Sequence, residues 1–357
     1  MLAGCGGSPA ATTAVPSVTA TTSPGVTTSG ISPAECAKNK AAETILFQTS
    51  YDYAAAASIA DVVVAADRGY FTDMCLTVKL QSGFSTDNVA LVSANRIQMS
   101  SLGSDSEVLA AVAKDANLEG VLTYGKTAIS ELITPGDSHY RNLKQLDGTT
   151  VGIKGALPYE VASMMAKAGV DIASLKQVQE GYDPDVINQG RITALPVYKS
   201  NEIHTLESQG EKFHVWDPTA YGIAASYGVM IVNTGFAKAH PTAVEDFLRA
   251  DLEGFLWGYR HQAETVADCQ ARLDPKLYIT PGDSAFRWRI EAGIVVSSTP
   301  AGKPIGAIDF PLVTKEYAQD NQLKLVPAGV DVRRAFNPLF VDEIYDGTTL
   351  IWPTRFS

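Results

Sequence analysis

Cysteine and histidine are scarce in this sequence, which has four cysteines and five histidines in 357 residues. No CxxC pair, no HExxH motif and no histidine pair at ligand spacing occurs, so we expect no bound metal. Long apolar runs are also missing. The best candidate, Ser58–Ala66, is broken by Asp61 and falls short of the roughly 20 residues that a spanning helix needs. We expect no cofactor either, because no segment shows a cofactor motif in its proper context.

Basic clusters are absent as well. Lysine and arginine total 28 against 39 acidic residues, a net charge of −11. This balance excludes an extended nucleic-acid surface or a basic patch for anionic membranes. Hydrophobic residues make up 45% and charged residues 19%, as in globular proteins. The length predicts two domains or a single large one.

The N-terminal segment differs from the rest, because no charged residue occurs before Glu35. Residues 8–33 contain twelve Ser or Thr and four Pro, which predicts a disordered tether over residues 6–42. Ahead of it, Leu2-Ala3-Gly4-Cys5 resembles a bacterial lipobox, in which the cysteine is lipidated. We therefore expect residues 1–5 to be the remnant of a signal sequence and Cys5 to carry a lipid anchor on the extracytoplasmic face. The alternative is an ordinary disordered tail with an incidental cysteine.

Three cysteines remain, and their spacing fits no metal motif. In an exported protein a disulfide is permitted, and Cys36 and Cys75 are the expected pair because both flank the first βα unit. Cys269 then stays free. The alternative is that all three are small buried apolar side chains.

Short β-rich runs alternate with helical periodicity from Glu43 onward, which predicts parallel βαβ units. Expected strands are 45–49, 76–80, 97–100, 121–124, 150–153, 176–179, 192–197, 214–216 and 229–232. Expected helices include 54–68, 86–94, 105–114, 158–168, 185–189 and 201–208, and the strongest begins at Pro241. A polar connector, Thr134–His139, separates two similar series. We expect lobe 1 to comprise residues 43–130 and 236–357, and lobe 2 residues 131–235.

The sequence resembles the THI5-like (NMT1-like) solute-binding proteins of ABC importers from about Glu43 to Arg260. The resemblance is carried in order by ADRGYF at 66–71, LKQLDGTTVGI at 143–153, KAGV at 167–170 and GRITAL at 190–195. It implies an α/β protein with the two-lobed type II periplasmic-binding-protein fold, each lobe a mainly parallel sheet flanked by helices. It also implies a monomer that captures a small-molecule solute and delivers it to ABC permease and ATPase subunits. Thr193 stands where family members usually carry Asp, so the exact solute does not carry over.

The expected site follows from strand ends, because ligands of α/β sheets bind beyond the carboxyl ends of strands. Loops and helix N-termini at these positions supply aromatic faces, hydroxyl groups and backbone N–H groups. The expected ligand-binding residues are Tyr51, Asp52, Tyr53, Ser101, Gly103, Ser104, Lys126, Gly155, Ala156, Leu157, Glu180, Tyr182, Asp183, Tyr221 and Tyr227. For each of them, packing or helix capping is the plain alternative.

Clustered aromatic and acidic residues favour a flat, nitrogen-bearing ring held by stacking and carboxylate acceptors. This agrees with the thiamine-precursor pyrimidine that the resemblance implies. Riboflavin, and sulfonates, taurine or nitrate, are the alternatives. The anions would need cations, for which only Lys126 and Lys154 are suitably placed.

Two enzymatic interpretations are weaker. Residues 120–127 read GVLTYGKT, which fits the phosphate-loop pattern, but its middle residues are themselves a predicted strand. A pyrimidine synthase on the same fold would use a cysteine-rich segment that this sequence lacks. We therefore expect a binding protein and not an enzyme.

Overall fold

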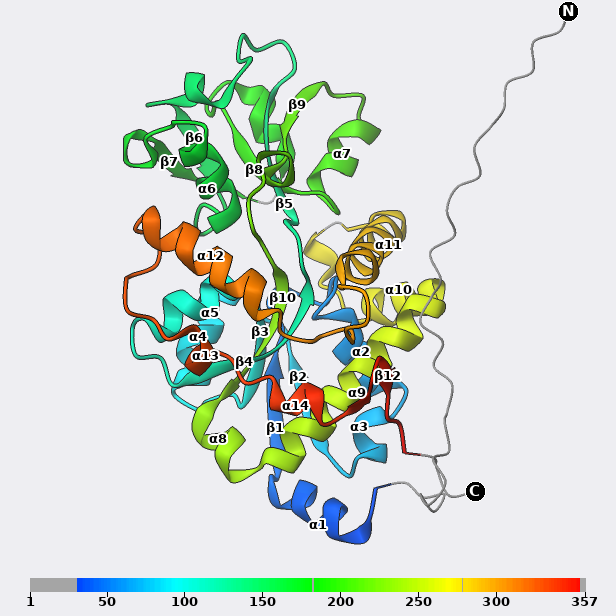
Figure 1. Cartoon of the computed structure of the whole chain (residues 1–357). Coiled ribbons are helices and arrows are strands. Elements are labelled where there is room, and N and C mark those ends of the chain that lie inside the picture. The colour runs from blue at the N-terminus through cyan, green and yellow to red at the C-terminus, as the bar shows by residue number, and fades with distance from the viewer. Residues whose placement is uncertain (1–30, 182, 278, 354–357) are drawn as a thin grey trace, which may run out of the picture.

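Two lobes joined by crossing strands make up the computed structural model, which describes residues 31–181, 183–277 and 279–353 (Figure 1). The larger lobe surrounds a five-stranded sheet, and the smaller lobe surrounds a three-stranded and a two-stranded sheet. The expected α/β class is therefore confirmed. Cys5 and residues 6–30 of the expected tether lie outside the described residues.

The sheet of the larger lobe has the order β2-β1-β3-β10-β4. Its strands are β1 (Thr44–Gln48), β2 (Thr77–Gln81), β3 (Met99–Leu102), β4 (Leu118–Gly125) and β10 (Tyr227–Asn233). β1 runs parallel to both β2 and β3, whereas β10 runs antiparallel to β3 and β4. β10 is buried throughout and alternates between two apolar clusters, with Val229 and Ile231 on one face and Met230 and Val232 on the other. This is the period of two that a strand buried on both faces must have.

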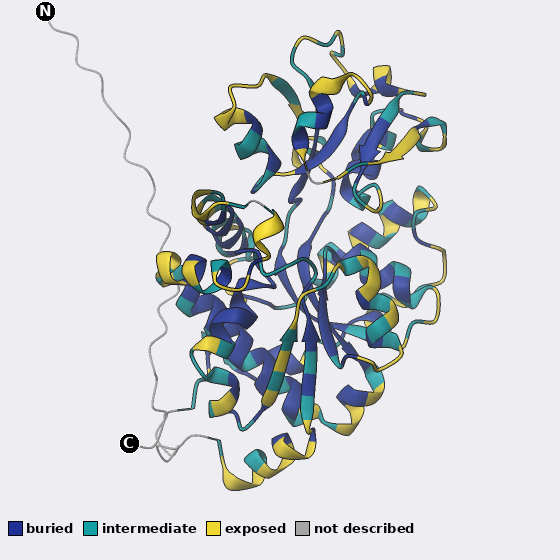
Figure 2. Ribbon diagram, turned by 180° about the vertical axis from the view of Figure 1, so that it is seen from behind, coloured by how far each residue is buried: buried dark blue, intermediate teal, exposed yellow. Residues whose placement is uncertain are grey.

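Helices cover both faces of this sheet. One face is covered by α2 (Ala60–Asp67), α3 (Tyr70–Asp73), α8 (Thr234–Ala239), α9 (Pro241–Arg260), α10 (Gln262–Gln270), α11 (Pro281–Ser298) and α14 (Leu339–Asp342). The other is covered by α4 (Ser85–Ser93), α5 (Asp105–Val112), α12 (Phe310–Gln322) and α13 (Val332–Ala335). The hairpin β11 (Tyr345–Asp346) and β12 (Thr349–Leu350) and the short 3-10 helix η5 (Pro275–Leu277) complete this lobe. The apolar stripe predicted after Pro241 is buried in α9, and Figure 2 shows buried residues concentrated where helices meet the sheet.

The smaller lobe has β5 (Ser130–Pro135) at its centre, between β8 (Leu195–Tyr198) and β9 (Phe213–Trp216). A parallel pair, β6 (Thr150–Ile153) and β7 (Lys176–Gln179), lies beside them. Its helices are α6 (Tyr159–Lys167), α7 (Glu202–Ser208) and the 3-10 helices η1 (Leu143–Leu146), η2 (Ile172–Ser174), η3 (Pro184–Gln189) and η4 (Pro218–Tyr221). Leu132, Val151 and Met164 join strand and helix into one apolar cluster.

Three expectations about this architecture need correction. The sheets are mixed and not mainly parallel, because β5 and β10 run antiparallel to their neighbours. Both strands belong to the passages between the lobes, so they enter each sheet from the opposite end. β10 hydrogen-bonds into the larger sheet, so residues 227–233 lie in the larger lobe and not in the lobe expected to run to residue 235. The connector expected at 134–139 begins inside β5.

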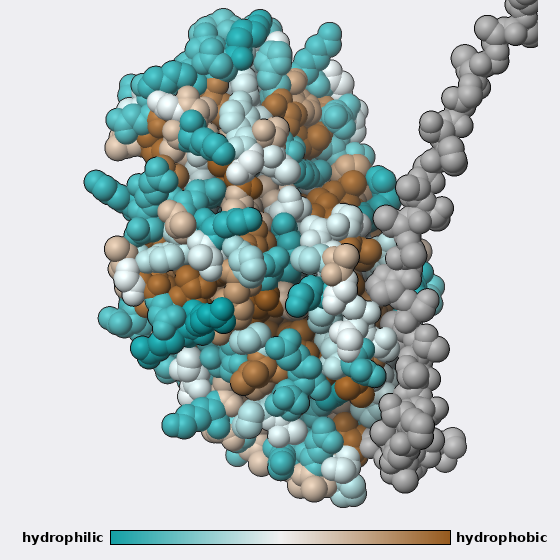
Figure 3. Space-filling view, in the orientation of Figure 1, coloured by the Kyte–Doolittle hydropathy of each residue, from teal (hydrophilic) through white to brown (hydrophobic). Residues whose placement is uncertain are grey.

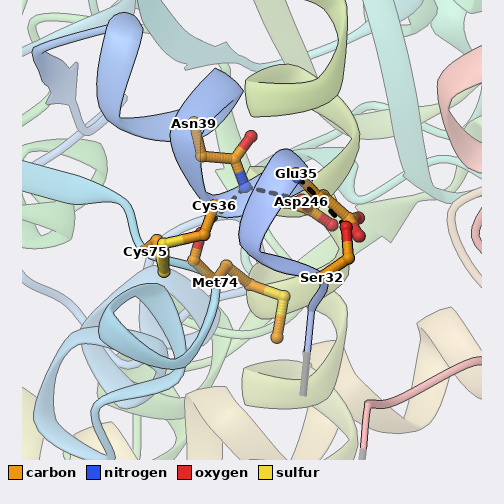
Figure 4. Close-up of a disulfide and its surroundings, with 7 residues drawn as sticks. All are labelled: Ser32, Glu35, Cys36, Asn39, Met74, Cys75 and Asp246. Carbon is orange, nitrogen blue, oxygen red and sulfur yellow. Dashed lines mark hydrogen bonds between the residues drawn. A yellow bond between two sulfur atoms is a disulfide. The ribbon is translucent and has the colours of Figure 1, made fainter. Parts of the chain in front are cut away.

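The expected tether also ends earlier than residue 42, because α1 (Pro33–Ala41) forms a helix packed against α9. Ser32 caps it and Pro33 opens it, the usual chemistry of a helix start. The predicted disulfide between Cys36 and Cys75 is present and joins α1 to the turn before β2 (Figure 4). The Asn39 amide adds buried hydrogen bonds to the Met74 carbonyl, at 2.8 Å, and to Asp246, at 2.6 Å.

No helix among the described residues combines the length and apolar character that crossing a membrane requires. Figure 3 shows hydrophobic and hydrophilic groups interspersed over one face of the molecule, without a single large apolar patch. The described residues also contain no group of three or more His, Cys, Asp or Glu side chains placed to hold a metal ion.

Candidate functional site

A cavity of about 220 Å³ lies between the two lobes and is lined from both. The larger lobe contributes the loop after β1, the end of β3, the start of β10 and one face of α11. The smaller lobe contributes the start of β5, the loop after β6 and the segment from β8 into α7. The lining residues are Ser50, Tyr51, Ala54, Ala56, Ala57, Ser58, Ile59, Ser85, Leu102, Gly103, Ile129, Ser130, Lys154, Ala156, Pro158, Pro196, Val197, Tyr198, Asn201, Glu202, Tyr227, Gly228, Arg287 and Glu291.

The loop after β1 forms much of the larger lobe's wall. The sequence predicts a helix from Ala54, but α2 begins only at Ala60. Ser58 adopts a φ of +68°, in the left-handed region, which interrupts the helical backbone just before α2. As a result Ala56, Ala57 and Ser58 present small side chains to the cavity and leave room for a solute.

A buried ion pair lies on the smaller-lobe side, where Lys154 donates to the Glu202 carboxylate. The same carboxylate accepts the Tyr198 backbone N–H at 2.8 Å. Burial by itself would raise the pKa of Glu202, but Lys154 and these hydrogen bonds hold it below the ordinary value. Glu202 is therefore charged, and the pair neutralises itself inside the cavity wall.

α11 brings a second acid and a second base to the cavity. The Glu291 carboxylate accepts from the Ala57 N–H of the larger lobe at 2.9 Å and from the Ser200 hydroxyl of the smaller lobe at 2.6 Å. Arg287 donates to the Asn201 side chain, again across the lobes. Burial raises the pKa of Glu291. With two basic and two acidic side chains in its lining, the cavity has no net formal charge.

Tyrosines line the cavity from opposite sides. Tyr51 comes from the larger lobe and packs edge-on against Phe84, with 5.7 Å between ring centroids. Tyr198 ends β8 in the smaller lobe and is 44% exposed. Tyr227 is buried, and its hydroxyl donates to the Glu291 carbonyl at 2.6 Å. Two partly exposed aromatic rings thus face one cavity from different lobes.

The cavity brings together four of the expected ligand-binding residues: Tyr51, Gly103, Ala156 and Tyr227. Lys154, considered above as a cation for an anionic solute, is there too. Ten others lie elsewhere, and Tyr182 lies outside the described residues. Their side chains or backbone groups contact other parts of the protein. Their ligand roles remain predictions.

In the larger lobe, Asp52 accepts the Asp274 N–H, and Ser101 donates to the Ser58 carbonyl. Tyr53 packs on the core near Arg272. Ser104 precedes α5. Lys126 donates to the Thr123 carbonyl, and GVLTYGKT is mostly strand β4, so no phosphate loop forms there. In the smaller lobe, the Gly155 N–H donates to the Gln179 side chain, and Glu180 pairs with Arg191. Leu157 and Tyr221 pack on the core, and Asp183 caps η3.

Sequence reasoning missed the contribution of α11. A signal was present, since Arg287 and Glu291 stand one helical turn apart beside Trp288, Ala292 and Val295, which are fully buried. Charged residues on an apolar stripe are seldom buried without a partner. Asn201, Glu202 and Tyr198 follow β8 and could have been found by the strand-end rule.

The fold is that of periplasmic binding proteins. The alkanesulfonate-binding protein of Xanthomonas axonopodis pv. citri, bound to MOPS, matches with a TM-score of 0.62 and 12% identity, over 82% of this chain and 98% of that one. A Candida albicans protein described as having the generic periplasmic binding protein fold matches with a TM-score of 0.59 and 15% identity, over 86% and 97%. A desulfurization enzyme shares the fold at a TM-score of 0.53 and 12% identity, over 84% and 98%.

The family follows from the sequence itself. The family model described as NMT1/THI5 like matches residues 56–265, more than half of the chain. The chain therefore belongs to the NMT1/THI5-like family, as the motifs in its first two thirds predicted. No match is found among the curated proteins.

Proposed function

We propose that this protein is the extracytoplasmic solute-binding component of an ABC importer and that its cleft captures a small heteroaromatic nutrient, such as a thiamine-precursor pyrimidine. The observation that carries this proposal is the pair of partly exposed rings, Tyr51 and Tyr198, that line one cavity from opposite lobes. A flat ring between them would gain stacking on both faces once the lobes close.

The polar groups of the cavity support a neutral or weakly basic ring. The two cations are already engaged, Lys154 with Glu202 and Arg287 with Asn201. Serine hydroxyls and carboxylate oxygens with further lone pairs line the same space and can accept from ring N–H or amino groups. Such groups fix the orientation of a nitrogen heterocycle.

The size of the cavity favours a single ring. Its volume of about 220 Å³ is below the ~300–1,000 Å³ of pockets for drug-sized ligands. A pyrimidine with short substituents suits this space better than the three fused rings of a flavin. Riboflavin is therefore the weaker of the heteroaromatic candidates.

A sulfonate is the second candidate, and one observation favours it. Lys154 and Arg287 both reach the cavity lining, and either could exchange its present partner for an anionic group. A sulfonate on Lys154 would, however, leave the buried Glu202 carboxylate without its cation, which is costly, and one on Arg287 would leave Asn201 without its donor. We therefore rank it second.

Catalysis is not part of the proposal. The lining residues within the described ranges include no cysteine or histidine, so no thiol or imidazole is placed to attack a bound solute. The proposed role is capture and delivery to the permease and ATPase subunits, by a monomer.

A thermal-shift panel with thiamine pyrimidines, flavins, sulfonates and nitrate tests the proposal. A bound solute at a hundredfold excess over its Kd raises stability by about 2.7 kcal/mol. We expect the pyrimidines to give the largest shift. The variant Tyr51→Ala/Tyr198→Ala should lose it, and the matched control Tyr51→Phe/Tyr198→Phe should keep it. A shift with sulfonates that survives the alanine variant would instead support the second candidate.

We also propose that a lipid on Cys5 anchors the protein to the membrane. The tether rich in Ser, Thr and Pro between Cys5 and α1 would let the folded part reach a permease. Cys5→Ser is expected to release the protein from membranes in cell fractionation. Membrane association that persists in this variant would reject the anchor.

A further inference from the structure

An acidic junction joins the lobes on the side of the molecule opposite α11. α12 belongs to the larger lobe, where it packs on α5, and it also touches α6 of the smaller lobe (Figure 1). Asp320 of α12 accepts from Ser106 of α5 at 2.6 Å and from Ser163 of α6 at 3.2 Å. Glu316, one turn earlier, and Glu160 of α6 line the same small cleft. We call Glu160, Glu316 and Asp320 the acid junction.

The hydroxyl groups at this junction are shared unevenly among its acids: Ser226 donates to Glu316 Oε2 at 3.1 Å, whereas Ser106 lies between two carboxyl groups. Ser106 has a single hydroxyl hydrogen, yet its oxygen lies 2.6 Å from Asp320 and 3.3 Å from Glu316. It can donate to only one of them. The other contact is favourable when the Glu316 carboxyl holds a proton and donates it to Ser106.

The second oxygen of Glu316 also indicates a protonated carboxyl group. Glu316 Oε1 is buried and has no hydrogen-bond partner, and the residue is 1% exposed. An unpartnered oxygen of an ionised carboxylate would be very costly there, whereas that of a neutral carboxyl is tolerated more readily. Geometry and burial together thus place a proton on Glu316.

The surroundings of the junction supply little positive charge. Nine residues line its cleft, Ser104, Ser106, Glu160, Ala224, Ala225, Ser226, Glu316, Gln319 and Asp320, and none of these is basic. The titratable groups facing it are Asp105 and Glu107 of α5, Tyr159 of α6, Tyr198 at the end of β8, Asp309 before α12, and Lys126 after β4. Burial raises the pKa of Asp105 to about 6 and that of Glu107 to about 7, and it lowers that of Lys126 to about 8.

We propose that the acid junction is a proton-dependent latch. The protonated junction holds the smaller lobe against α12, and loss of the proton lets the lobes separate. Ionisation would place like charges on both sides of the joint, with Glu160 on the smaller lobe and Glu316 and Asp320 on the larger. Their repulsion, and the demand of the buried charges for water, opposes the Asp320–Ser163 contact. The latch does not depend on which solute the cleft takes.

The direction of the pH effect follows from the carboxyl groups. Burial raises the pKa of all three, so the folded junction binds protons more tightly than the unfolded chain. The stabilisation that the junction provides is complete below the pH range in which ordinary carboxyl groups titrate. It is lost as the pH rises through the raised pKa values. Lys126 loses its charge over the same rise, which removes the nearby cation. Opening therefore increases with pH.

Spin labels on opposite lobes test the latch in ligand-free protein. The labels are attached at Arg96→Cys in the larger lobe and Lys176→Cys in the smaller, both exposed positions, in a Cys5→Ser background, and Cys269 is buried. We expect the inter-label distance, measured by pulsed electron resonance, to shift to longer values between about pH 5 and about pH 9. In Glu316→Gln/Asp320→Asn, which keeps the shape but not the charges, this shift should disappear.

Two further variants keep the test decisive. Glu253→Gln removes another carboxyl whose pKa burial raises, but on α9, so the wild-type pH profile should persist. Ser163→Ala removes the smaller-lobe contact without changing charge and should give longer distances already at about pH 5. The same distances at both pH values in the wild type overturn the latch, as does a pH profile in the Gln/Asn variant that parallels the wild type.

Discussion

A single phenol hydroxyl lies between two buried carboxyl groups in the core of the larger lobe. Tyr124 Oη is 2.8 Å from Asp61 and 2.7 Å from Asp251, and all three residues are fully buried. Because the phenol has one hydrogen, one carboxyl must be protonated and donate to it. Burial raises the pKa of Asp61, and burial and the neighbouring Asp61 raise that of Asp251. The core of α2, β4 and α9 therefore carries a bound proton.

This pair makes stability depend on pH. Since the folded pKa values are raised, the pair contributes most below the ordinary carboxyl range and loses its contribution as the pH rises. We expect the free energy of unfolding, measured in urea, to fall towards alkaline pH. Asp251→Asn should make that fall shallower, because the amide replaces a protonated carboxyl without a charge. An equally steep fall in this variant would contradict the shared proton.

Removing the central hydroxyl should cost stability at every pH. Tyr124→Phe leaves two buried carboxyl groups without their common partner, a loss of about 1–3 kcal/mol. Chemical denaturation of this variant checks the value. Tyr227→Phe is a control, because its hydroxyl contacts a backbone carbonyl and not a carboxyl. A Tyr124→Phe variant as stable as the wild type would show that the hydroxyl does not bridge the acids.

Among the elements, α1 depends most on a covalent link. It lies at the end of the larger lobe away from the smaller lobe (Figure 1), and the Cys36–Cys75 disulfide closes a loop of 39 residues. Closing such a loop restricts the unfolded chain and contributes about 4 kcal/mol in the chain-entropy treatment. A stable disulfide also fits an oxidising compartment outside the cytoplasm.

Reduction or replacement of the disulfide should therefore weaken the whole domain. We expect Cys36→Ser/Cys75→Ser to lower the free energy of unfolding by about 4 kcal/mol and to make it insensitive to reductant. Urea denaturation with and without dithiothreitol measures both effects. Should reductant leave the wild-type midpoint unchanged, α1 would be held by Asn39 and its packing alone.

The elements also show what local sequence patterns can and cannot specify. Strands β6 and β7 match their predicted bounds, because short β-rich runs ended by turn residues define them locally. α2 starts six residues later than periodicity suggested, because the positive φ of Ser58 interrupts the helical backbone. α11 and α12 carry no motif, and their roles in joining the lobes arise only from tertiary contacts such as Glu291–Ser200.

Local sequence patterns likewise specify only part of the candidate site. Tyr51, Gly103 and Ala156 could be placed in the cavity because they follow the carboxyl ends of strands, whereas Tyr227 stands at the start of β10, where the chain returns to the larger lobe. Arg287 and Glu291 could be recognised as charges on an apolar helix stripe but not placed at the cleft, because their helix reaches it only after the chain has returned to the larger lobe. Tyr53 and Asp52 adjoin Tyr51 in sequence, but they contact Arg272 and Asp274 outside the cavity.

At the scale of the whole molecule, two helices from the C-terminal third hold the smaller lobe on either side of the crossing strands. α11 does so through Glu291, Arg287 and the stacking of Phe286 on His204, whose ring centroids are 4.0 Å apart. α12 does so through Asp320. The cleft between them is where a guest molecule would be enclosed by rotation of one lobe about the crossing strands.

The most direct test of the account is a calorimetric titration of the wild-type protein with a thiamine-precursor pyrimidine, followed by chemical analysis of the recovered solute. We predict saturable binding of one molecule per chain, weakened at least about tenfold in Tyr51→Ala/Tyr198→Ala, with the solute returned unaltered. A titration without heat of binding, or recovery of a chemically converted solute, would contradict it.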